Sequence, residues 1–198
     1  MGVLSVGDLA VTVIVVVSDT HGTDGHRLEG RTLRAVRTAE LVVHAGDFTT
    51  DAVLDAFRAE AVGGRDGGED GSRAGEFVAV AGNNDDAAVR RRLAATEVVE
   101  RAGVRFVVVH GHDHSRTGLG YLRREADADV VVVGHSHRPG WEPAGERAVL
   151  NPGSHADPRR YRPAHAELEP TAEGLNGRLV TPGGEVISEF DLAVTGRE

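Results

Sequence analysis

Histidine, aspartate and asparagine side chains occur together in five short motifs that could bind metal ions. In chain order the motifs are Asp19-Thr20-His21, Gly46-Asp47, Gly82-Asn83-Asn84-Asp85, His110-Gly111-His112 and Gly134-His135-Ser136-His137. Imidazole, carboxylate and amide ligands suit Mn, Fe, Ni or Zn, and they suit a thiolate-seeking metal poorly. The motifs hold seven candidate ligands, which are too many for one tetrahedral ion. They suit two ions, with one bridging carboxylate and with water in the remaining positions.

Each motif directly follows a short run rich in valine. The runs cover Val11–Val17, Leu41–Val43, Phe77–Ala81, Val104–Val109 and Val130–Val133. Short, nearly continuous apolar runs of β-branched residues are typical of strands buried on both faces. Amphipathic segments predict helices over Arg27–Ala39, Asp51–Ala61, Asp86–Ala94 and Thr117–Ala126. This alternation indicates an α/β core, in which sites form beyond the carboxyl ends of the strands, so we expect the five motifs to meet at one rim.

The spacing within the motifs indicates how the ligands share ions. Residues i and i+2 of an extended chain point to the same side, so we expect Asp19 and His21 to bind one ion. His135 and His137 have the same spacing and would either share an ion or divide between two. A single Asp-x-His or Gly-Asp motif is more often a cap or a turn than a metal ligand. Five such motifs in one structural position make a metal site the better interpretation.

The composition of the 198-residue chain excludes several other chemistries. It has no cysteine, which rules out a disulfide scaffold, a zinc finger, an iron–sulfur site and a thiol nucleophile. All 22 basic residues are arginine, so a P-loop lysine and a Schiff-base lysine are absent. Because 31 acidic residues bring the formal net charge to −9, we expect no non-specific binding to nucleic acid.

The length and the hydropathy pattern predict one domain over residues 1–198 and no association with a membrane. No segment reaches the ~18 apolar residues that span a bilayer. The run Leu9–Val17 is preceded by Asp8 and is not followed by a small-residue cleavage site, so we interpret it as a buried strand of a cytoplasmic protein. The segment Gly63–Gly75 is rich in glycine and charge, which predicts a flexible surface loop.

The chain after Trp141 predicts antiparallel hairpins. Its short apolar segments are Ala148–Leu150, Ala164–Leu168, Arg178–Val180 and Val186–Leu192. Turn signals at Asn176-Gly177 and Pro182-Gly183-Gly184 separate them.

The ordered set of five motifs resembles the calcineurin-like metallophosphoesterase superfamily. The small size and the segment Asn151-Pro152-Gly153-Ser154 are similar to the small prokaryotic phosphodiesterase family within it. The resemblance extends from Val11 to about Leu192. It implies an α/β fold, a four-layer α-β-β-α sandwich with two mixed β-sheets face to face and helices outside. The implied activity is that of a dinuclear-metal-dependent phosphodiesterase, in which a hydroxide between two ions attacks phosphorus in line.

The resemblance also assigns the metal ligands position by position. A first ion would be held by the Asp-x-His motif and the last histidine of the set, namely Asp19, His21 and His137. A second ion would be held by one amide and two imidazoles, namely Asn83, His110 and His135. Asp47 would bridge the two ions. We expect Mn²⁺ at both positions, with Ni²⁺, Fe²⁺ and Zn²⁺ as alternatives.

Residues beside the motifs could act on the substrate. His112 lies two residues after a ligand and would either contact the substrate or leaving group or belong to a loop. Many superfamily members carry histidine at the position of Asn84, and that histidine is thought to assist the leaving group. An amide supplies no titrating proton, so we expect Asn84 to bind a phosphoryl oxygen and the enzyme to prefer diesters or good leaving groups. Arg159 or Arg160 could pair with a phosphate, although a solvated arginine is the simpler interpretation.

The remaining histidines and the tryptophan are expected to be structural. His44 lies within a predicted strand, where it would be packed or would support a ligand. His26, His155 and His165 are expected at the surface, and Trp141 is expected to pack.

Two alternatives accompany the phosphodiesterase interpretation. The segment from His110 to His114 resembles a metal motif of metallo-β-lactamase-like hydrolases, but it is one residue short and leaves the other motifs unexplained. The second alternative is a non-catalytic metal-binding scaffold that resembles the retromer subunit vacuolar sorting protein 29. Metal-dependent turnover of a generic diester distinguishes the two. The expected partner is a small-molecule phosphoester, and since members of this family often self-associate, a homo-oligomer is a further expectation.

Overall fold

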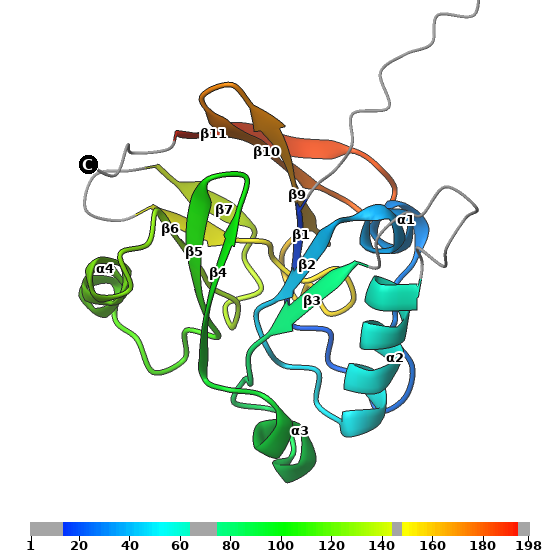
Figure 1. Cartoon of the computed structure of the whole chain (residues 1–198). Helices are drawn as coiled ribbons and strands as arrows, with labels where there is room; N and C mark the ends of the chain where they lie inside the picture. The colour runs from blue at the N-terminus through cyan, green and yellow to red at the C-terminus, as the bar shows by residue number, and fades with distance from the viewer. Residues whose placement is uncertain (1–13, 64–74, 144–147, 194–198) are drawn as a thin grey trace, which may run out of the picture.

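The computed structural model describes residues 14–63, 75–143 and 148–193, and in these ranges the chain forms two mixed β-sheets (Figure 1). The six strands of the first sheet are, in spatial order, β11 (Val186–Ala193), β10 (Gly174–Val180), β9 (His165–Thr171), β1 (Ile14–Val17), β2 (Leu41–His44) and β3 (Glu76–Ala79). Strands β1, β2 and β3 are parallel, whereas β9, β10 and β11 form an antiparallel extension of β1.

The second sheet has five strands. Their spatial order is β4 (Thr96–Arg101), β5 (Val104–Val109), β6 (Val130–Val132), β8 (Val149–Asn151) and β7 (Gly140–Glu142). The inner strands β5, β6 and β8 are parallel, and the two edge strands run antiparallel to their neighbours.

Helices cover the outer faces of both sheets. The first sheet is covered by α1 (Gly30–Thr38) and α2 (Asp51–Gly63), with α3 (Ala87–Arg92) at one end of α2 (Figure 1). The second sheet is covered by α4 (Arg116–Glu125). The α/β fold with four layers, helix–sheet–sheet–helix, is thereby confirmed.

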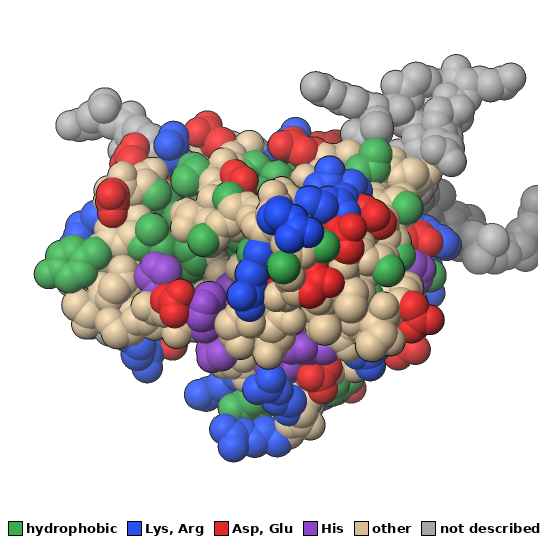
Figure 2. All heavy atoms as spheres, turned by 90° about the horizontal axis from the view of Figure 1, so that it is seen from below, with side chains coloured by type: hydrophobic (Ala, Val, Ile, Leu, Met, Phe, Trp, Pro, Cys, Tyr) green, Lys and Arg blue, Asp and Glu red, His purple; other side chains and the backbone are tan. Residues whose placement is uncertain are grey.

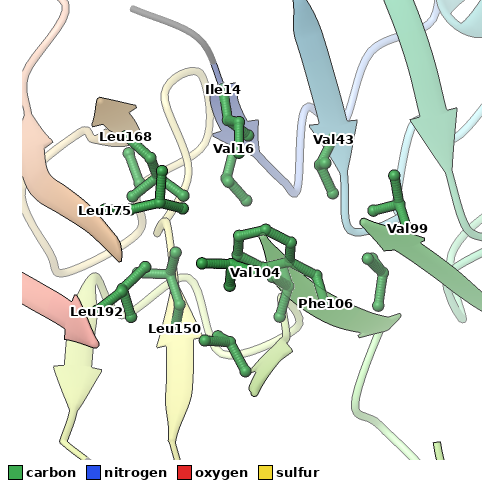
Figure 3. Packing of buried hydrophobic residues seen from close by; sticks show 14 of the residues in the cluster. Ile14, Val16, Val43, Val99, Val104, Phe106, Leu150, Leu168, Leu175 and Leu192 are labelled. Atoms are coloured by element: carbon green, nitrogen blue, oxygen red, sulfur yellow. The ribbon is translucent and has the colours of Figure 1, made fainter. Parts of the chain in front are cut away.

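One apolar cluster fills the space between the sheets (Figure 3). Successive side chains of a strand point to opposite faces, and β1 buries both of its faces. Ile14 and Val16 point toward the second sheet, where they share the cluster with Phe106. Val15 and Val17 pack instead in the cluster beneath α1 and α2. This two-sided burial explains why the strand has no polar alternation in its sequence.

A strand forms at each of the five valine-rich runs and a helix at each of the four amphipathic segments, as predicted, although the ends of the elements are shifted. The predicted flexible loop falls on residues 64–74, which lie outside the described residues, as does the first part of the Val11–Val17 run. The terminal antiparallel strands are also confirmed. Within the described ranges, no helix combines the length and the apolar character needed to cross a membrane.

The Asn176-Gly177 turn was predicted wrongly. Both residues lie inside β10, where Gly177 pairs with Leu168 on one side and Phe190 on the other. A Cβ atom at Gly177 would lie 2.2 Å from the Phe190 ring, so glycine here makes room for an aromatic side chain. The second signal, Pro182–Gly184, does form the turn into β11.

The five motifs follow the carboxyl ends of β1, β2, β3, β5 and β6, as the α/β pattern predicted. The motif after β3 leads directly into α3. There Asp86 acts as the N-cap, accepting hydrogen bonds from the N–H groups of Ala88 and Val89 at 2.8 and 2.9 Å. The loops that carry the candidate ligands are therefore anchored at both ends by regular structure.

Candidate metal centre

Five of the seven predicted ligands have a left-handed backbone. The φ angle is 54° at Asp19, 44° at His21, 63° at Asp47, 63° at His135 and 57° at His137. This conformation costs a non-glycine residue of order 1–3 kcal/mol, and it persists where the surroundings enforce it, often at functional sites. The extended backbone predicted for the first motif is therefore wrong, because the chain turns at Asp19 and at His21.

The first motif nevertheless gathers three ligands. Nε2 of His137 lies 3.3 Å from Oδ1 of Asp19, and Nε2 of His21 lies 3.8 Å from the same oxygen. One atom from each of the three residues lies within 4.8 Å of the others. Asp19, first, and then Asp47 raise the pKa of His21, although partial burial opposes them. The three side chains leave a space that a single cation could fill.

Asp47 lies between this group and the next. Its Oδ2 is 3.4 Å from Nε2 of His21 and 3.2 Å from Nε2 of His110. Asn84 donates to both carboxylate oxygens, from its backbone N–H at 2.8 Å and from its side-chain amide at 2.7 Å. Burial opposes ionisation, but His110 and Asn84 outweigh it and hold the pKa of the Asp47 carboxyl well below its usual range. Asp47 is therefore a fixed anion between the two groups.

The second group converges on the amide oxygen of Asn83. Nε2 of His110 lies 3.1 Å from this oxygen and Nδ1 of His135 lies 2.9 Å from it. His110 is buried, whereas His135 is exposed. Carboxylate oxygens of Asp19 and Asp47 also lie within 4.8 Å of a ring nitrogen of His110. The structure thus brings all seven predicted residues to one place, while their role as metal ligands stays a prediction.

Four buried atoms at this place have no hydrogen-bond partner among the described residues. They are both carboxylate oxygens of Asp19 and the Nε2 atoms of His21 and His137. A buried polar atom without a partner costs about 1–3 kcal/mol, so such atoms call for an explanation. A divalent cation would satisfy all four at once. The donor set therefore fits a metal ion of the kind that the sequence predicts.

Backbone carbonyls orient two of the imidazoles. Nδ1 of His110 lies 2.7 Å from the carbonyl oxygen of Ala45, and Nδ1 of His137 is bonded to the carbonyl oxygen of Asp157. A carbonyl only accepts, so each Nδ1 carries a proton, and Nε2 is the ring nitrogen that would bind a metal ion once it has no proton. This arrangement is typical of metal-binding histidine.

Asp85, for which no role was predicted, is buried beside the ligands. Its carboxylate accepts hydrogen bonds from the N–H groups of Gly82 at 2.7 Å, Thr49 at 2.7 Å and Asp47 at 3.2 Å. Burial raises the pKa of Asp85, and the backbone donors oppose the rise. The residue joins the loops that carry Asp47 and Asn83. In the sequence, this role is indicated by the position of Asp85 at the end of the third motif.

Arg27 and Ser154 tie the first motif to a distant loop. The guanidinium of Arg27 donates to the carbonyls of Thr20 at 2.8 Å and Ala156 at 2.9 Å. The Ser154 hydroxyl donates to the carbonyl of Asp19 at 2.7 Å. The Asn-Pro-Gly-Ser segment indicates a role for Ser154, whereas no sequence motif indicates a role for Arg27. Both residues position the ligand loops.

His112 and Arg159, predicted to act on the substrate, have no bond to a ligand side chain among the hydrogen bonds and ion pairs of the described residues. The His112 ring lies 5.5 Å from the His110 ring and 6.1 Å from the His135 ring, and its Nε2 is 2.9 Å from a carboxylate oxygen of Asp113. Arg159 is exposed and follows the loop whose carbonyl holds His137. Their roles stay predictions.

The expected surface position of His155 and His165 was wrong, because both are buried. Strand β9 pairs with β1, which places His165 beneath α1. There Nδ1 of His165 lies 3.0 Å from the Thr32 hydroxyl and Nε2 lies 2.9 Å from Glu167. Short hairpin strands at the end of a chain usually have an exposed face, but here α1 covers it.

His44 is packed and supports the ligand loops, as expected. Its Nε2 lies 2.9 Å from the Thr20 hydroxyl, and the N–H of Gly46 donates to its Nδ1 at 3.2 Å. Complete burial lowers the pKa of His44 well below its usual value, so the ring is neutral.

Histidine side chains gather in the middle of the face that Figure 2 shows, which is the lower end of the molecule in Figure 1. Basic side chains, all of them arginine in this chain, lie on either side of them (Figure 2). Acidic side chains also lie on this face, beside the histidines (Figure 2).

The chain belongs to the calcineurin-like phosphoesterase superfamily, whose domain description matches residues 13–171. It is 28% identical, over 184 residues, to a probable metallophosphoesterase of Methanothermobacter thermautotrophicus, with 91% of this chain and 98% of the relative covered. Zinc-bound Vps29 of Entamoeba histolytica has a similar fold at a TM-score of 0.67 and 24% identity, with 90% of this chain and 98% of that chain covered. A structure described as a novel archaeal phosphodiesterase aligns at a TM-score of 0.60 and 21% identity, covering 84% of this chain and 99% of that one.

Proposed function

We propose that this protein is a phosphodiesterase that uses two divalent metal ions. The observation that carries the proposal is the set of buried atoms without partners around Asp19, joined by Asp47 to a second cluster of donors. The family membership supports the coarser activity, hydrolysis of a phosphoester. The name of the archaeal phosphodiesterase supports a diester substrate.

The candidate ligands form two metal positions. Asp19, His21 and His137 would hold one ion and Asn83, His110 and His135 the other, with Asp47 between them. When bound, two such ions neutralise charge on the phosphoryl oxygens and let water act as a nucleophile near neutral pH. Hydrogen bonds of Arg27, Ser154 and Asp85 join the ligand loops, and donors held in place in this way spare a reaction the cost of ordering them.

Hydrolysis forms one bond from a water oxygen to phosphorus and breaks the bond from phosphorus to the leaving oxygen. The leaving alkoxide needs a proton. His112 is the proposed donor, since it is partly exposed and its ring lies near those of His110 and His135. Arg159 is proposed to pair with a phosphate oxygen. We propose Mn²⁺ as the metal, with Ni²⁺, Fe²⁺ and Zn²⁺ as alternatives, because mixed carboxylate, amide and imidazole ligands suit all four ions.

A specific observation favours a second candidate function. Vps29 of Entamoeba histolytica binds zinc in a fold of this kind, so the fold alone does not establish turnover. A metal-binding scaffold would retain the donor clusters. It would show no metal-dependent hydrolysis of any diester.

The test measures metal content and hydrolysis of bis(p-nitrophenyl) phosphate in the same preparations. We expect two ions per chain and metal-dependent turnover in the wild type, and loss of both in Asp47→Ala. Asp24→Ala is the matched control, because Asp24 is an exposed carboxylate whose bonded neighbour is Thr23. A single bound ion with an active Asp47→Ala variant would contradict the two-metal proposal. Full metal content without turnover would favour the scaffold.

A further inference from the structure

A pocket of about 680 Å³ lies between α4 and the outer face of the second sheet. Its walls come from the first turn of α4, from the end of β6, and from β8 and β7. His135 also belongs to the wall, so the pocket adjoins the second cluster of donors. Its volume lies within the range of small-molecule sites in proteins, about 300–1,000 Å³. A group attached to a phosphate at that cluster therefore has room to enter the pocket.

The register of β7 shows which of its side chains face the pocket. Trp141 lies opposite Leu150 and stacks on Phe190 with ring centroids 5.1 Å apart, so its indole belongs to the cluster between the sheets. This confirms the packing expected of Trp141. Successive side chains of a strand point to opposite faces, so Gly140 and Glu142 face the pocket. A Cβ atom at Gly140 would meet no described atom within 4 Å beyond its chain neighbours, which leaves open space over this residue.

Aliphatic side chains form the floor of the pocket. Leu119 comes from α4, Val133 follows β6, and Val149 comes from β8. Val133 belongs to the buried cluster beneath α4, and Leu119 and Val149 pack against that cluster. The floor is therefore the edge of an apolar layer that continues under the helix. An apolar group that lies on this floor is stabilised by leaving water, and this needs no directed bond.

Most polar side chains of the wall already have partners. The amide nitrogen of Asn151 donates to the Gly134 carbonyl at 2.8 Å and to the Ser136 hydroxyl at 3.0 Å. The amide oxygen of Asn151 accepts a backbone N–H at 2.9 Å. Arg116, on α4, forms an ion pair with Glu142, on β7. These groups are therefore engaged with the protein itself and are not free to bind a ligand.

Two further polar residues line the pocket. Arg138 is exposed, so its charge is solvated. The Tyr161 hydroxyl accepts a hydrogen bond from the guanidinium of Arg160 at 3.2 Å. The wall therefore offers few groups that would replace the water around the hydroxyl groups of a sugar, and burying a polar group without a partner is unfavourable. An aliphatic floor with engaged polar neighbours favours an apolar ligand.

We infer that this pocket binds an apolar substituent of the phosphoester, of the alkyl class, on the floor formed by Leu119, Val133 and Val149. The inference rests on the proposed function, because it places the phosphate at the donor clusters. It makes the substrate an ester of phosphate with a hydrophobic alcohol.

The test is isothermal titration calorimetry of the Mn²⁺-loaded protein with methyl, propyl and hexyl phosphate, which differ only in the length of the alkyl chain. We expect the affinity to rise by up to about fourfold for each methylene that the pocket buries. Glycerol 1-phosphate has the chain length of propyl phosphate but carries two hydroxyl groups, and it should bind more weakly than propyl phosphate. Equal affinities for methyl and hexyl phosphate, or tighter binding of glycerol 1-phosphate than of propyl phosphate, would overturn the inference.

Two variants locate the alkyl chain. Gly140→Leu places a side chain in the open space of the pocket, so it should remove the gain in affinity with chain length and leave methyl phosphate binding unchanged. Gly63→Leu is the matched control, because a Cβ atom there also meets no described atom within 4 Å, at the end of α2 and outside the pocket.

Val149→Thr replaces one methyl group of the floor by a hydroxyl and provides a second measurement should Gly140→Leu fold poorly. It should weaken the binding of hexyl phosphate more than that of methyl phosphate. A gain with chain length that stays unchanged in Gly140→Leu and in Val149→Thr would place the alkyl chain elsewhere and overturn the assignment.

The outcome is independent of turnover. A protein that binds hexyl phosphate through this pocket but hydrolyses no diester would refute the proposed function and keep the pocket assignment. A protein that hydrolyses diesters but binds methyl and hexyl phosphate equally well would refute the pocket assignment alone.

Discussion

The amide at position 84 is bound to the carboxylate that separates the two donor clusters. Asn84 donates from its backbone to one oxygen of Asp47 and from its side chain to the other. In this geometry its side-chain amide uses one N–H to orient Asp47, and the second N–H is available to a phosphoryl oxygen, so the expected substrate contact of Asn84 stays a prediction. The amide nitrogen supplies no titrating proton. A residue that acts on the leaving group must therefore lie elsewhere.

This leads to a prediction for leaving groups. A positioned general acid raises the reaction rate by about 10²–10⁴-fold, and a poorly placed acid lowers the rate most when the leaving oxygen is strongly basic. The proposed donor His112 is bonded to Asp113 and not to a ligand, so we expect it to compensate only in part and the rate for aryl and alkyl diesters to fall steeply as the pKa of the leaving group rises. Asn84→His should flatten this slope, measured by steady-state kinetics over a series of diesters at saturating metal.

The control for this prediction is His112→Ala, which removes the proposed donor. A steep slope in the wild type that His112→Ala makes no steeper would exclude His112 as the acid. A shallow wild-type slope, unchanged by Asn84→His but steepened by His112→Ala, would show that His112 already protonates the leaving group. In that case the prediction for Asn84 is wrong.

The sequence predicted which residues gather at the site, but not how the backbone presents them. Residue type and position after a strand were enough to select Asp19, Asp47 and His135. Their left-handed φ angles depend on contacts between loops, such as those of Arg27 and Asp85, which are distant in the sequence. Such contacts have no local signal in the sequence.

At the scale of elements, the two edge strands of the second sheet were not predicted from the sequence, whereas both edge strands of the first sheet, β3 and β11, were. Four of the five valine-rich strands lie inside the sheets, where both faces are covered and apolar residues run without interruption. Strand β4 is an edge strand with Val99 as its one buried residue, so its sequence shows little apolar pattern. Strand β7 has three residues and follows Pro139. Whether such a short, exposed segment forms a strand depends on pairing with a neighbouring strand and not on its own sequence.

Gly177 allows a prediction at the same scale. It lies inside β10, where a Cβ atom would meet the Phe190 ring at 2.2 Å. Gly177→Ala should displace this ring and lower the free energy of unfolding by about 1–3 kcal/mol, as overpacking of a core does. Gly183→Ala is the matched control, because its Cβ would meet its nearest neighbour, the Thr181 hydroxyl, at an ordinary 3.6 Å. Urea unfolding of both variants measures the difference; equal stability would contradict the packing role of Gly177.

Across the whole molecule, some ionised side chains are buried and others are exposed. Glu167 is buried in β9 and accepts hydrogen bonds from Arg31 at 2.7 Å and Arg178 at 2.9 Å, with His165 beside it. Burial opposes its ionisation, but Arg31 and His165, with Arg178, hold the pKa of Glu167 well below its ordinary 4.5. The contribution of this group to stability is present above that value and is lost as the pH falls below it. This network stabilises the contact of α1 with the first sheet.

A second buried titratable group, the imidazole of His155, makes the stability of the folded protein depend on pH in milder acid. His155 is buried and neither ring nitrogen has a hydrogen-bond partner among the described residues. Burial, followed by the neighbouring His165 and Arg27, lowers the pKa of His155 to about 3 from an ordinary 6.5, although the backbone of His26 opposes the shift. Between these two values the unfolded chain binds a proton that the folded chain excludes. The free energy of unfolding must therefore fall as the pH falls from 6.5 toward 3.

We predict that His155→Leu removes this part of the pH dependence. Each bound proton contributes a slope of up to about 1.4 kcal/mol per pH unit, so the variant should lose stability more slowly than the wild type between about pH 7 and pH 5. The measurement is urea unfolding at several pH values, with the difference between variant and wild type cancelling the titration shared by the other histidines. His114→Leu, at a half-buried histidine, serves as the control and should keep the wild-type slope. If the slopes of His155→Leu and wild type coincide, His155 is already protonated in the folded protein, and the buried ring must have a partner that keeps its pKa near 6.5.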